Sequence, residues 1–225
     1  MADLVTIEDV KAAAVRLSRV AQRTPVEAST ACSALAGVTT LLKCEHLQRT
    51  GSFKIRGAFN RLALLEEAEK ARGVVCASAG NHAQGVALSA SLLGLDATVF
   101  MPTTAPLPKV EATRRYGARV ILTGDTFDDA YSASTNWAAE RGAVEVHPFD
   151  HPDVIAGQGT LGLELIDQVP TLGTVVVPRR RGRPHLGNRR RGESPPARRA
   201  GHRCRGHRGR SRYRCARSGL RAAST

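Results

Sequence analysis

The chain has 225 residues, of which 42% are hydrophobic, and it carries a formal net charge of +13. This composition is ordinary for a globular protein of one large or two small domains, and no apolar run approaches the roughly 18 residues that a membrane span requires. Acidic residues stand near the N-terminus where a secretory signal would have an apolar core, so we expect a cytoplasmic protein.

The five cysteines include no C-x-x-C pair and lack the dense spacing of a disulfide-rich domain. We therefore predict free thiols and no metal site. Cys76 lies in the apolar run GVVCAS, where a buried small hydrophobe is expected rather than a nucleophile.

The positive charge is confined to the C-terminal segment. Residues 179–225 contain 17 Arg, no Lys and one acid, Glu193, which leaves a net charge of −3 for the residues before them. Because this segment has almost no aliphatic residue with which to bury a face, we predict a disordered tail. Two interpretations stay open: the tail binds nucleic-acid phosphates, or it is not native sequence.

The N-terminal part of the chain predicts two helices and a strand. Thr6 followed by Asp9 is typical of a helix N-terminal cap, and apolar residues continue at helical spacing to Val20. Residues 38–45 are rich in β-branched and apolar residues and predict a strand, whereas residues 55–71 carry apolar residues at helical intervals.

From residue 73 onward, strands and helices alternate. Runs rich in β-branched residues predict strands at 73–78, 96–101, 118–124 and 143–147, and a last short strand at 173–178. Helices are predicted at 81–95, 106–117, 126–142 and within 151–169. Short strands separated by helices indicate parallel βαβ units, so the predicted fold class is α/β.

Lys54 follows small residues and Phe53 at the start of a predicted helix. The macrodipole disfavours a cation at a helix N-terminus. The position is therefore unusual for a solubilising lysine and suits one that reacts as a neutral amine, forming a Schiff base with an aldehyde. On spacing alone, a solvated lysine remains the alternative.

The segment SAGNHAQG, residues 78–85, follows a predicted strand and opens the next helix. Small residues there leave backbone N–H groups available to an anion, and Asn81 adds a side-chain donor. Gly80 as a tight turn with Asn81 as the N-cap is the purely structural alternative. His82 could equally be a surface residue of the first turn.

Together these segments identify a family. SFKIRGA around Lys54 and SAGNHAQGVA from Ser78, with KCEHLQ upstream and GQGT downstream, resemble the threonine dehydratases and their serine dehydratase and serine racemase relatives. The resemblance covers residues 6–178 in order and spacing. It implies a pyridoxal-phosphate (PLP) enzyme of fold type II, similar to tryptophan synthase β, with two α/β domains built on parallel sheets.

The resemblance also implies the roles of the residues around the cofactor. Lys54 would be the Schiff-base lysine, Phe53 would pack near PLP, and Asn81 would bond its ring hydroxyl. The substrate amine would displace Lys54, which then takes the Cα proton while the ring delocalises the charge. The β-hydroxyl leaves, and the released product hydrolyses to 2-oxobutanoate from threonine, or pyruvate from serine, and ammonia.

Four residues are assigned by the same resemblance to the substrate. Ser78, Ala79 and Gly80 would belong to the loop that receives the carboxylate, and His82 is grouped with them. Serine racemases resemble this loop but have a serine at the position of Ala79, where it acts as a base on the opposite face. Because Ala79 cannot take a proton, elimination is favoured over racemisation.

The domain boundaries expected from the resemblance are 1–68 with 149–178 for an incomplete large cofactor domain, 69–148 for the small domain, and 179–225 for the tail. The family further implies an amino-acid substrate, homo-oligomers, and a role in the biosynthesis of isoleucine, a branched-chain amino acid. A β-replacement PLP enzyme is an alternative within the fold. The alternative of another class is an inactive fragment. Its tail would bind nucleic acid non-specifically, and no specific nucleic-acid partner is expected.

The chain departs from the family after residue 178. Relatives continue into a glycine-rich loop of the form GGGGLISG that holds the cofactor phosphate, whereas this chain has RRRGRPHLG. Codons chosen for residues 183–191 read GLISGTAA one nucleotide later, and the arginine codons before them can read as glycines. We therefore hypothesise a frameshift near Arg179, which predicts weak or absent PLP binding and negligible dehydratase activity.

Overall fold

The computed structural model describes residues 5–177 of the chain. Contacts group Met1–Val176 into one compact unit. The predicted disorder of the tail, the proposed frameshift, and Cys204 and Cys215 lie outside the described residues. Cys32, Cys44 and Cys76 are free thiols, as predicted.

The first helix, α1 (Ile7–Leu17), begins at the predicted cap. The Thr6 hydroxyl accepts from the Asp9 backbone N–H, and the Asp9 carboxylate accepts from the Thr6 N–H. This reciprocal pair satisfies two N–H groups that the helix leaves without partners. The predicted N-terminal cap is thereby confirmed, whereas the helix ends at Leu17 and does not reach Val20.

Three short elements follow α1. Strand β1 (Val26–Ala28) and helix α2 (Thr30–Ala36) were not predicted, and strand β2 (Leu41–Lys43) is shorter than the predicted 38–45. Strands β1 and β2 pair antiparallel. Three residues carry too little alternation to predict a strand, and the cap residues of α2, Ser29 and a left-handed Gly37, were the only local signals.

The predicted helix at 55–71 is wrong in extent, because two helices occupy it. Helix α3 (Lys54–Ala63) ends at Leu64, and α4 (Glu67–Lys70) begins with a new capping box formed by Glu66 and Glu69. Leu65 between them is buried. Burying this leucine in a turn while restarting the helix with its own cap explains the break.

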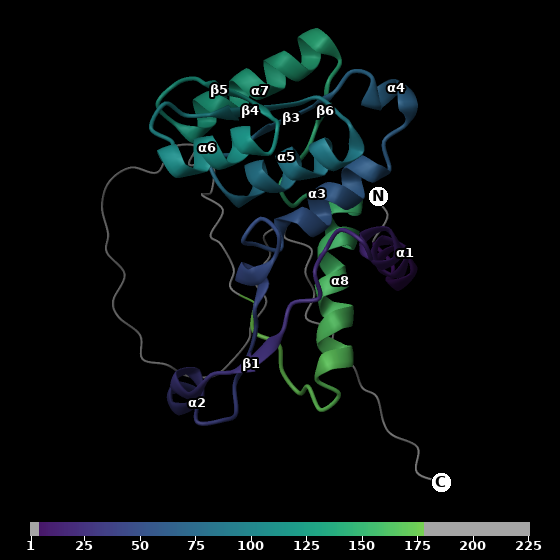
Figure 1. Ribbon diagram of the computed structural model, residues 1–225, viewed down its shortest axis with the longest axis vertical. Coiled ribbons are helices and arrows are strands. Elements are labelled where there is room, and N and C mark those ends of the chain that lie inside the picture. Colours follow the sequence, from purple (N-terminus) through teal and green to yellow (C-terminus); the bar gives the residue numbers. More distant parts are fainter. Residues whose placement is uncertain (1–4, 178–225) are drawn as a thin grey trace, which may run out of the picture. The chain divides into compact units, whose positions relative to one another are not determined.

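A four-stranded parallel sheet lies at the upper end of the described chain in Figure 1. Its strands are β3 (Val74–Ala77), β4 (Ala97–Met101), β5 (Arg119–Leu122) and β6 (Val144–Glu145), in the order β5-β4-β3-β6. The three helices that connect them in sequence are α5 (Asn81–Leu93), α6 (Leu107–Arg115) and α7 (Phe127–Arg141). The predicted alternation and the α/β class are confirmed.

Both faces of this sheet are covered. Val74 and Cys76 of β3 pack in one buried cluster with residues of α5 and α6, whereas Val75 and Ala77 pack in another with α7. Successive side chains of a strand point to opposite faces, so a run that is apolar at every position, VVCA, fits a strand buried on both sides. Figure 1 shows α7 on one side of the sheet and α5 and α6 on the other.

Helix α8 (Pro152–Gln168) packs against α3 at a close crossing. A Cβ on Gly157 would lie 2.5 Å from the Arg56 carbonyl oxygen, and one on Gly57 would lie 2.8 Å from the Val154 carbonyl oxygen. Only glycine permits such an approach. These two glycines therefore fix α8 beneath the helix that begins with Lys54.

The predicted last strand at 173–178 is wrong for the residues that the structure describes. Residues 173–177 have no strand conformation, and no described strand pairs with them. Val176 is 85% exposed. An apolar run forms a stable strand only with a hydrogen-bonded neighbour, which this segment lacks within residues 5–177.

No described helix is long and apolar enough to cross a membrane.

Candidate active site

Lys54 is the first residue of α3, as the sequence predicted. Its side chain is half-buried; the Nζ donates a hydrogen bond to the Pro148 carbonyl oxygen at 2.7 Å and lies 5.1 Å from the centre of the Phe53 ring. Phe53 is the N-cap and provides no side-chain acceptor. The amine is thus held beside an aromatic face at the helix N-terminus.

The SAGNHAQG segment turns from β3 into α5 at the carboxyl end of the parallel strand. Gly80 is the N-cap of α5 and no side chain caps the helix, while a Cβ added at Gly80 would meet nothing within 4 Å. The positive end of the helix therefore opens onto unfilled space. The alternative with Asn81 as the N-cap is wrong, because Asn81 is the first helical residue.

The Lys54 segment and this loop come together through α3 and α5. A Cβ on Gly85, in the second turn of α5, would lie 3.1 Å from both the carbonyl carbon and the carbonyl oxygen of Lys54. This close approach favours glycine, because a Cβ would push the backbone of α3 away by a few tenths of an ångström. The two segments that carry the family resemblance therefore form one site at the carboxyl edge of the sheet, where α/β folds bind ligands.

Asn81 is oriented by a residue that the sequence analysis missed. Its Oδ1 accepts a hydrogen bond from Lys109 Nζ of α6 at 3.0 Å. Because the oxygen faces Lys109, the amide N–H groups remain available to an acceptor on another side. Nothing local in PLPK indicates that this lysine reaches the loop.

His82 is not a surface residue, and that interpretation is wrong. Its side chain is buried, with Nε2 2.9 Å from the Val146 carbonyl oxygen. Burial lowers the pKa of His82 to about 4, although the hydrogen bond to the Val146 carbonyl oxygen acts in the opposite direction and raises it. His82 and Lys54 thus contact two carbonyls, Val146 and Pro148, of the segment that joins β6 to α8.

A buried ionic network lies behind Lys54. Arg56 is 1% exposed and donates to both oxygens of Glu45 at 2.9 Å, and to those of Glu164 at 2.7 and 3.0 Å. Lys43 donates to Glu164 at 2.5 Å. Burial raises the pKa of Glu164, but the hydrogen bonds from Arg56 and Lys43 outweigh it, so the pKa is lowered. The network ties the start of α3 to α8.

This network gives a structural role to KCEHLQ and GQGT, the two further motifs of the family resemblance. KCEHLQ supplies Lys43 and Glu45, and GQGT supplies Gly157 and Thr160, whose hydroxyl is 3.3 Å from Arg56 Nη1. The structural role of these two segments could not be predicted from their residues alone. Within the described residues, no group of three or more His, Cys, Asp or Glu side chains could hold a metal ion.

Comparisons with known proteins agree with this arrangement. A family model described as pyridoxal-phosphate dependent enzyme matches residues 17–188. An L-threonine ammonia-lyase of Thermotoga maritima is 53% identical over 175 residues, which cover 78% of this chain and 44% of that protein. One of Geobacter sulfurreducens is 53% identical over 163 residues, covering 72% and 40%. The chain therefore spans less than half the length of these relatives.

Solved structures show the same fold. A processed threonine deaminase isoform 2 of Solanum lycopersicum matches with a TM-score of 0.68 and 42% identity, covering 72% of this chain and 47% of that one. A maize serine racemase matches with a TM-score of 0.71 and 40% identity, covering 74% and 51%. The predicted resemblance and fold type are confirmed: this chain belongs to the family of pyridoxal-phosphate dependent enzymes.

Proposed function

We propose that Lys54 is the lysine that binds PLP, and that the site serves the dehydration and deamination of L-threonine, and of L-serine, to a 2-oxo acid and ammonia. The placement of Lys54 at the N-terminus of α3, beside the uncapped end of α5, carries the proposal. The names of the two L-threonine ammonia-lyases, each 53% identical, support the substrate.

The described residues fit two parts of the cofactor. Lys54 offers an amine for the aldehyde beside the Phe53 ring, and the Asn81 amide N–H groups suit the ring hydroxyl. The open space at Gly80 leaves room for a ligand next to the helix end. The residues expected to hold the phosphate, from 179 onward, lie outside the described residues.

When bound, PLP would delocalise the negative charge that forms at the substrate Cα. The chain's own residues then have separate tasks. The loop Ser78–Gly80 would receive the substrate carboxylate through the Ala79 N–H and the uncapped N–H groups of α5, because the Ser78 N–H donates to the Phe100 carbonyl oxygen at 3.0 Å and the Gly80 N–H to the Ser78 hydroxyl at 3.2 Å. Lys54 Nζ would carry the Cα proton on its own face. The Pro148 carbonyl gives the amine a hydrogen-bond partner next to this position. His82 would contribute by fixing the segment that carries Pro148.

A serine racemase is the second candidate, because the fold and 40% identity are shared with the maize enzyme of that name. Ala79 argues against it. A methyl side chain cannot carry a proton on the face opposite Lys54, which racemisation requires. We therefore propose that the chain forms no D-serine from L-serine.

We further propose that residues 179–225 are a frameshifted translation. The arginines from Arg179 stand where the resemblance implies glycines, and their bulk prevents the close backbone approach by which such loops hold phosphate. On this proposal the chain as it stands binds PLP weakly and turns over negligible threonine. The domain boundaries, cytoplasmic location, homo-oligomer and biosynthetic role remain proposals from the family.

Two proteins test the function and the frameshift separately. One is the chain as it stands; in the other, residues 179–225 are replaced by the residues that the next reading frame encodes. We expect 2-oxobutanoate from threonine and PLP only with the second, and its loss in Lys54→Ala. A second protein that binds PLP but forms no 2-oxobutanoate would refute the function. Lys54-dependent turnover by the first would refute the predicted loss of activity, and a nucleotide sequence whose next frame cannot encode GGLISG would refute the frameshift.

A further inference from the structure

A basic hollow opens at the edge of the sheet opposite to the candidate active site. It measures about 300 Å³ and is lined by the amino-terminal ends of β3, β4 and β5 and by the last turn of α7. Lys54 and the SAGNHAQG segment lie at the carboxyl ends of the same parallel strands. The hollow is therefore separate from that site, and its volume is at the small end of the range for ligand pockets, roughly 300–1,000 Å³.

The strand register places Arg119 and Thr98 side by side. They are directly paired residues of β5 and β4, so their side chains leave the same face of the sheet. Phe100 and Ile121, two residues further along each strand, pack with α7. Arg119 and Thr98 therefore lie on the α7 face, next to the last turn of that helix.

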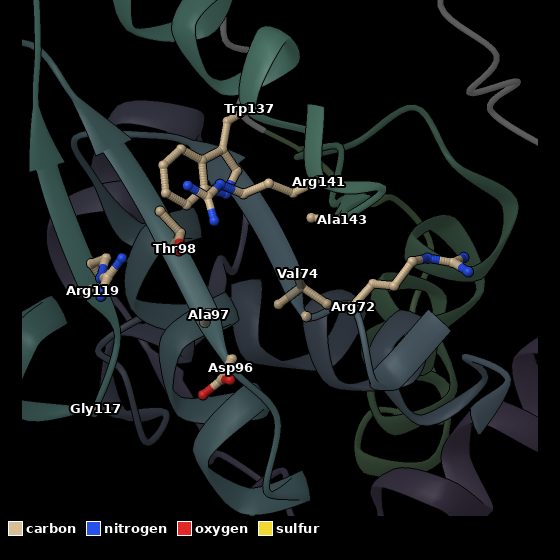
Figure 2. A pocket seen from close by; sticks show the side chains of 11 residues that line it. Arg72, Val74, Asp96, Ala97, Thr98, Gly117, Arg119, Trp137, Arg141 and Ala143 are labelled. Atoms are coloured by element: carbon tan, nitrogen blue, oxygen red, sulfur yellow. The ribbon is translucent and has the colours of Figure 1, made fainter. Parts of the chain in front are cut away.

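Helix α7 places a second arginine over this pair. The Arg141 guanidinium lies 3.9 Å from the centre of the Trp137 ring, and Trp137 packs edge-on against Phe100 at 5.7 Å. Figure 2 shows Arg141 lying across the indole beside Thr98. Stacking on the packed Trp137 ring holds the planar Arg141 guanidinium in place. Less side-chain conformational entropy is therefore lost when it binds a ligand.

A third arginine fixes the end of the helix. Arg72 Nε donates to the Gly142 carbonyl oxygen at 2.7 Å, directly after Arg141, and Figure 2 shows its side chain directed outward. Neither Arg119 nor Arg141 forms an ion pair with a carboxylate of the part of the chain that the structure describes. Among the described residues that line the hollow, Asp96 is the one acid.

We propose that this hollow binds a small phosphate-bearing molecule between Arg119 and Arg141, with the Thr98 hydroxyl as a further donor. Guanidinium groups match phosphate oxygens in pairs, and such charge-assisted hydrogen bonds are stronger than neutral ones. Asp96 opposes the anion and limits its affinity. The site is independent of PLP and of the proposed function.

Trp137 is the only tryptophan of the chain, so all tryptophan emission comes from one side chain that lines the hollow. Inorganic phosphate is titrated into the full chain at constant ionic strength, with NaCl as the reference. We expect a saturable change of emission as phosphate alters the contact of Arg141 with the ring. A change that does not saturate, or that NaCl reproduces, would overturn the proposal.

Three variants assign the binding to named residues. Arg119→Gln should weaken phosphate binding about tenfold, the effect of losing one charge-assisted hydrogen bond, and Asp96→Asn should strengthen it. Arg115→Gln removes the same charge from the exposed end of α6 and should leave the affinity unchanged. Equal effects of Arg119→Gln and Arg115→Gln would mean that phosphate binds the chain's arginines indiscriminately, and the site would be rejected.

Discussion

Replacing Arg56 by methionine should destabilise the fold more than any other single loss of charge in the described residues. Methionine keeps most of the aliphatic volume but removes the guanidinium, which is 1% exposed and bonds two carboxylates. Glu164 keeps Lys43 as a partner. Glu45 keeps only the Thr24 hydroxyl, at 2.7 Å, so its charge is left buried without a cation.

The expected loss follows from that stranded carboxylate. Removing one partner of a buried ion pair costs about 3–5 kcal/mol, most of it from the unpaired charge that remains. Adding Glu45→Gln to Arg56→Met should therefore restore part of the stability, because the buried group becomes neutral. Arg56→Lys should lower the free energy of unfolding less than Arg56→Met does, because lysine retains the charge. It should still be less stable than the original chain, because lysine loses the bidentate geometry.

Urea unfolding followed by circular dichroism measures these differences. Arg115→Met is the matched control: this arginine is exposed at the end of α6 and its loss should change the free energy of unfolding by no more than about 0.5 kcal/mol. A loss below about 1 kcal/mol for Arg56→Met, or no recovery in the double variant, would show that the network does not hold α3 to α8.

Three further predictions follow from packing and burial. Gly157→Ala should destabilise the chain by about 1–3 kcal/mol through overpacking at the α3 crossing, whereas Gly162→Ala in the same helix meets open space and should gain about 0.5–1 kcal/mol; equal unfolding midpoints would refute this. Cys76 is buried with its pKa raised to about 12, so a thiol reagent should label the partly exposed Cys32 before Cys76 under native conditions, as peptide mapping can check. The folded-state pKa of His82, about 4, lies below its usual 6.5. Since the unfolded chain therefore binds a proton more readily, the free energy of unfolding should decrease by about 3 kcal/mol as the pH falls from about 6.5 to 4. If His82→Gln leaves this decrease unchanged, the assignment is contradicted.

The sequence predicted the parallel sheet because each strand is short, β-branched and bounded by turns. VVCA and ATVFM are buried along almost their whole length, so their apolar, β-branched composition is enough to predict buried strands. Helix boundaries were harder, since a local cap decides them: Glu66 and Glu69 restart α4 within a stretch that has continuous helical spacing. The prediction of a strand at 173–178 was wrong because a strand needs a hydrogen-bonded neighbour, and the residues of the segment itself do not indicate whether one is present.

The site was predicted only in part, for a physical reason. Lys54 and the SAGNHAQG loop are continuous segments whose residue types carry their chemistry. Their supports are not continuous: Lys109 reaches Asn81 from 28 residues away, Pro148 meets Lys54 across 94, and Glu164 meets Arg56 across 108. Such contacts arise from the crossing of α3 with α5 and α8, which spacing in the sequence does not describe.

The central claim is that Lys54 is the lysine that binds PLP, and reductive trapping tests it most directly. The chain has five lysines, at 11, 43, 54, 70 and 109. PLP is added to the protein in which residues 179–225 are replaced by the residues that the next reading frame encodes. Borohydride then reduces the Schiff base, and peptide mapping locates the label among these five lysines at several PLP concentrations. We predict labelling of Lys54 at PLP concentrations that leave the exposed Lys11 unmodified, and loss of that label in Lys54→Ala. Labelling of Lys54 no greater than that of Lys11 would contradict the account.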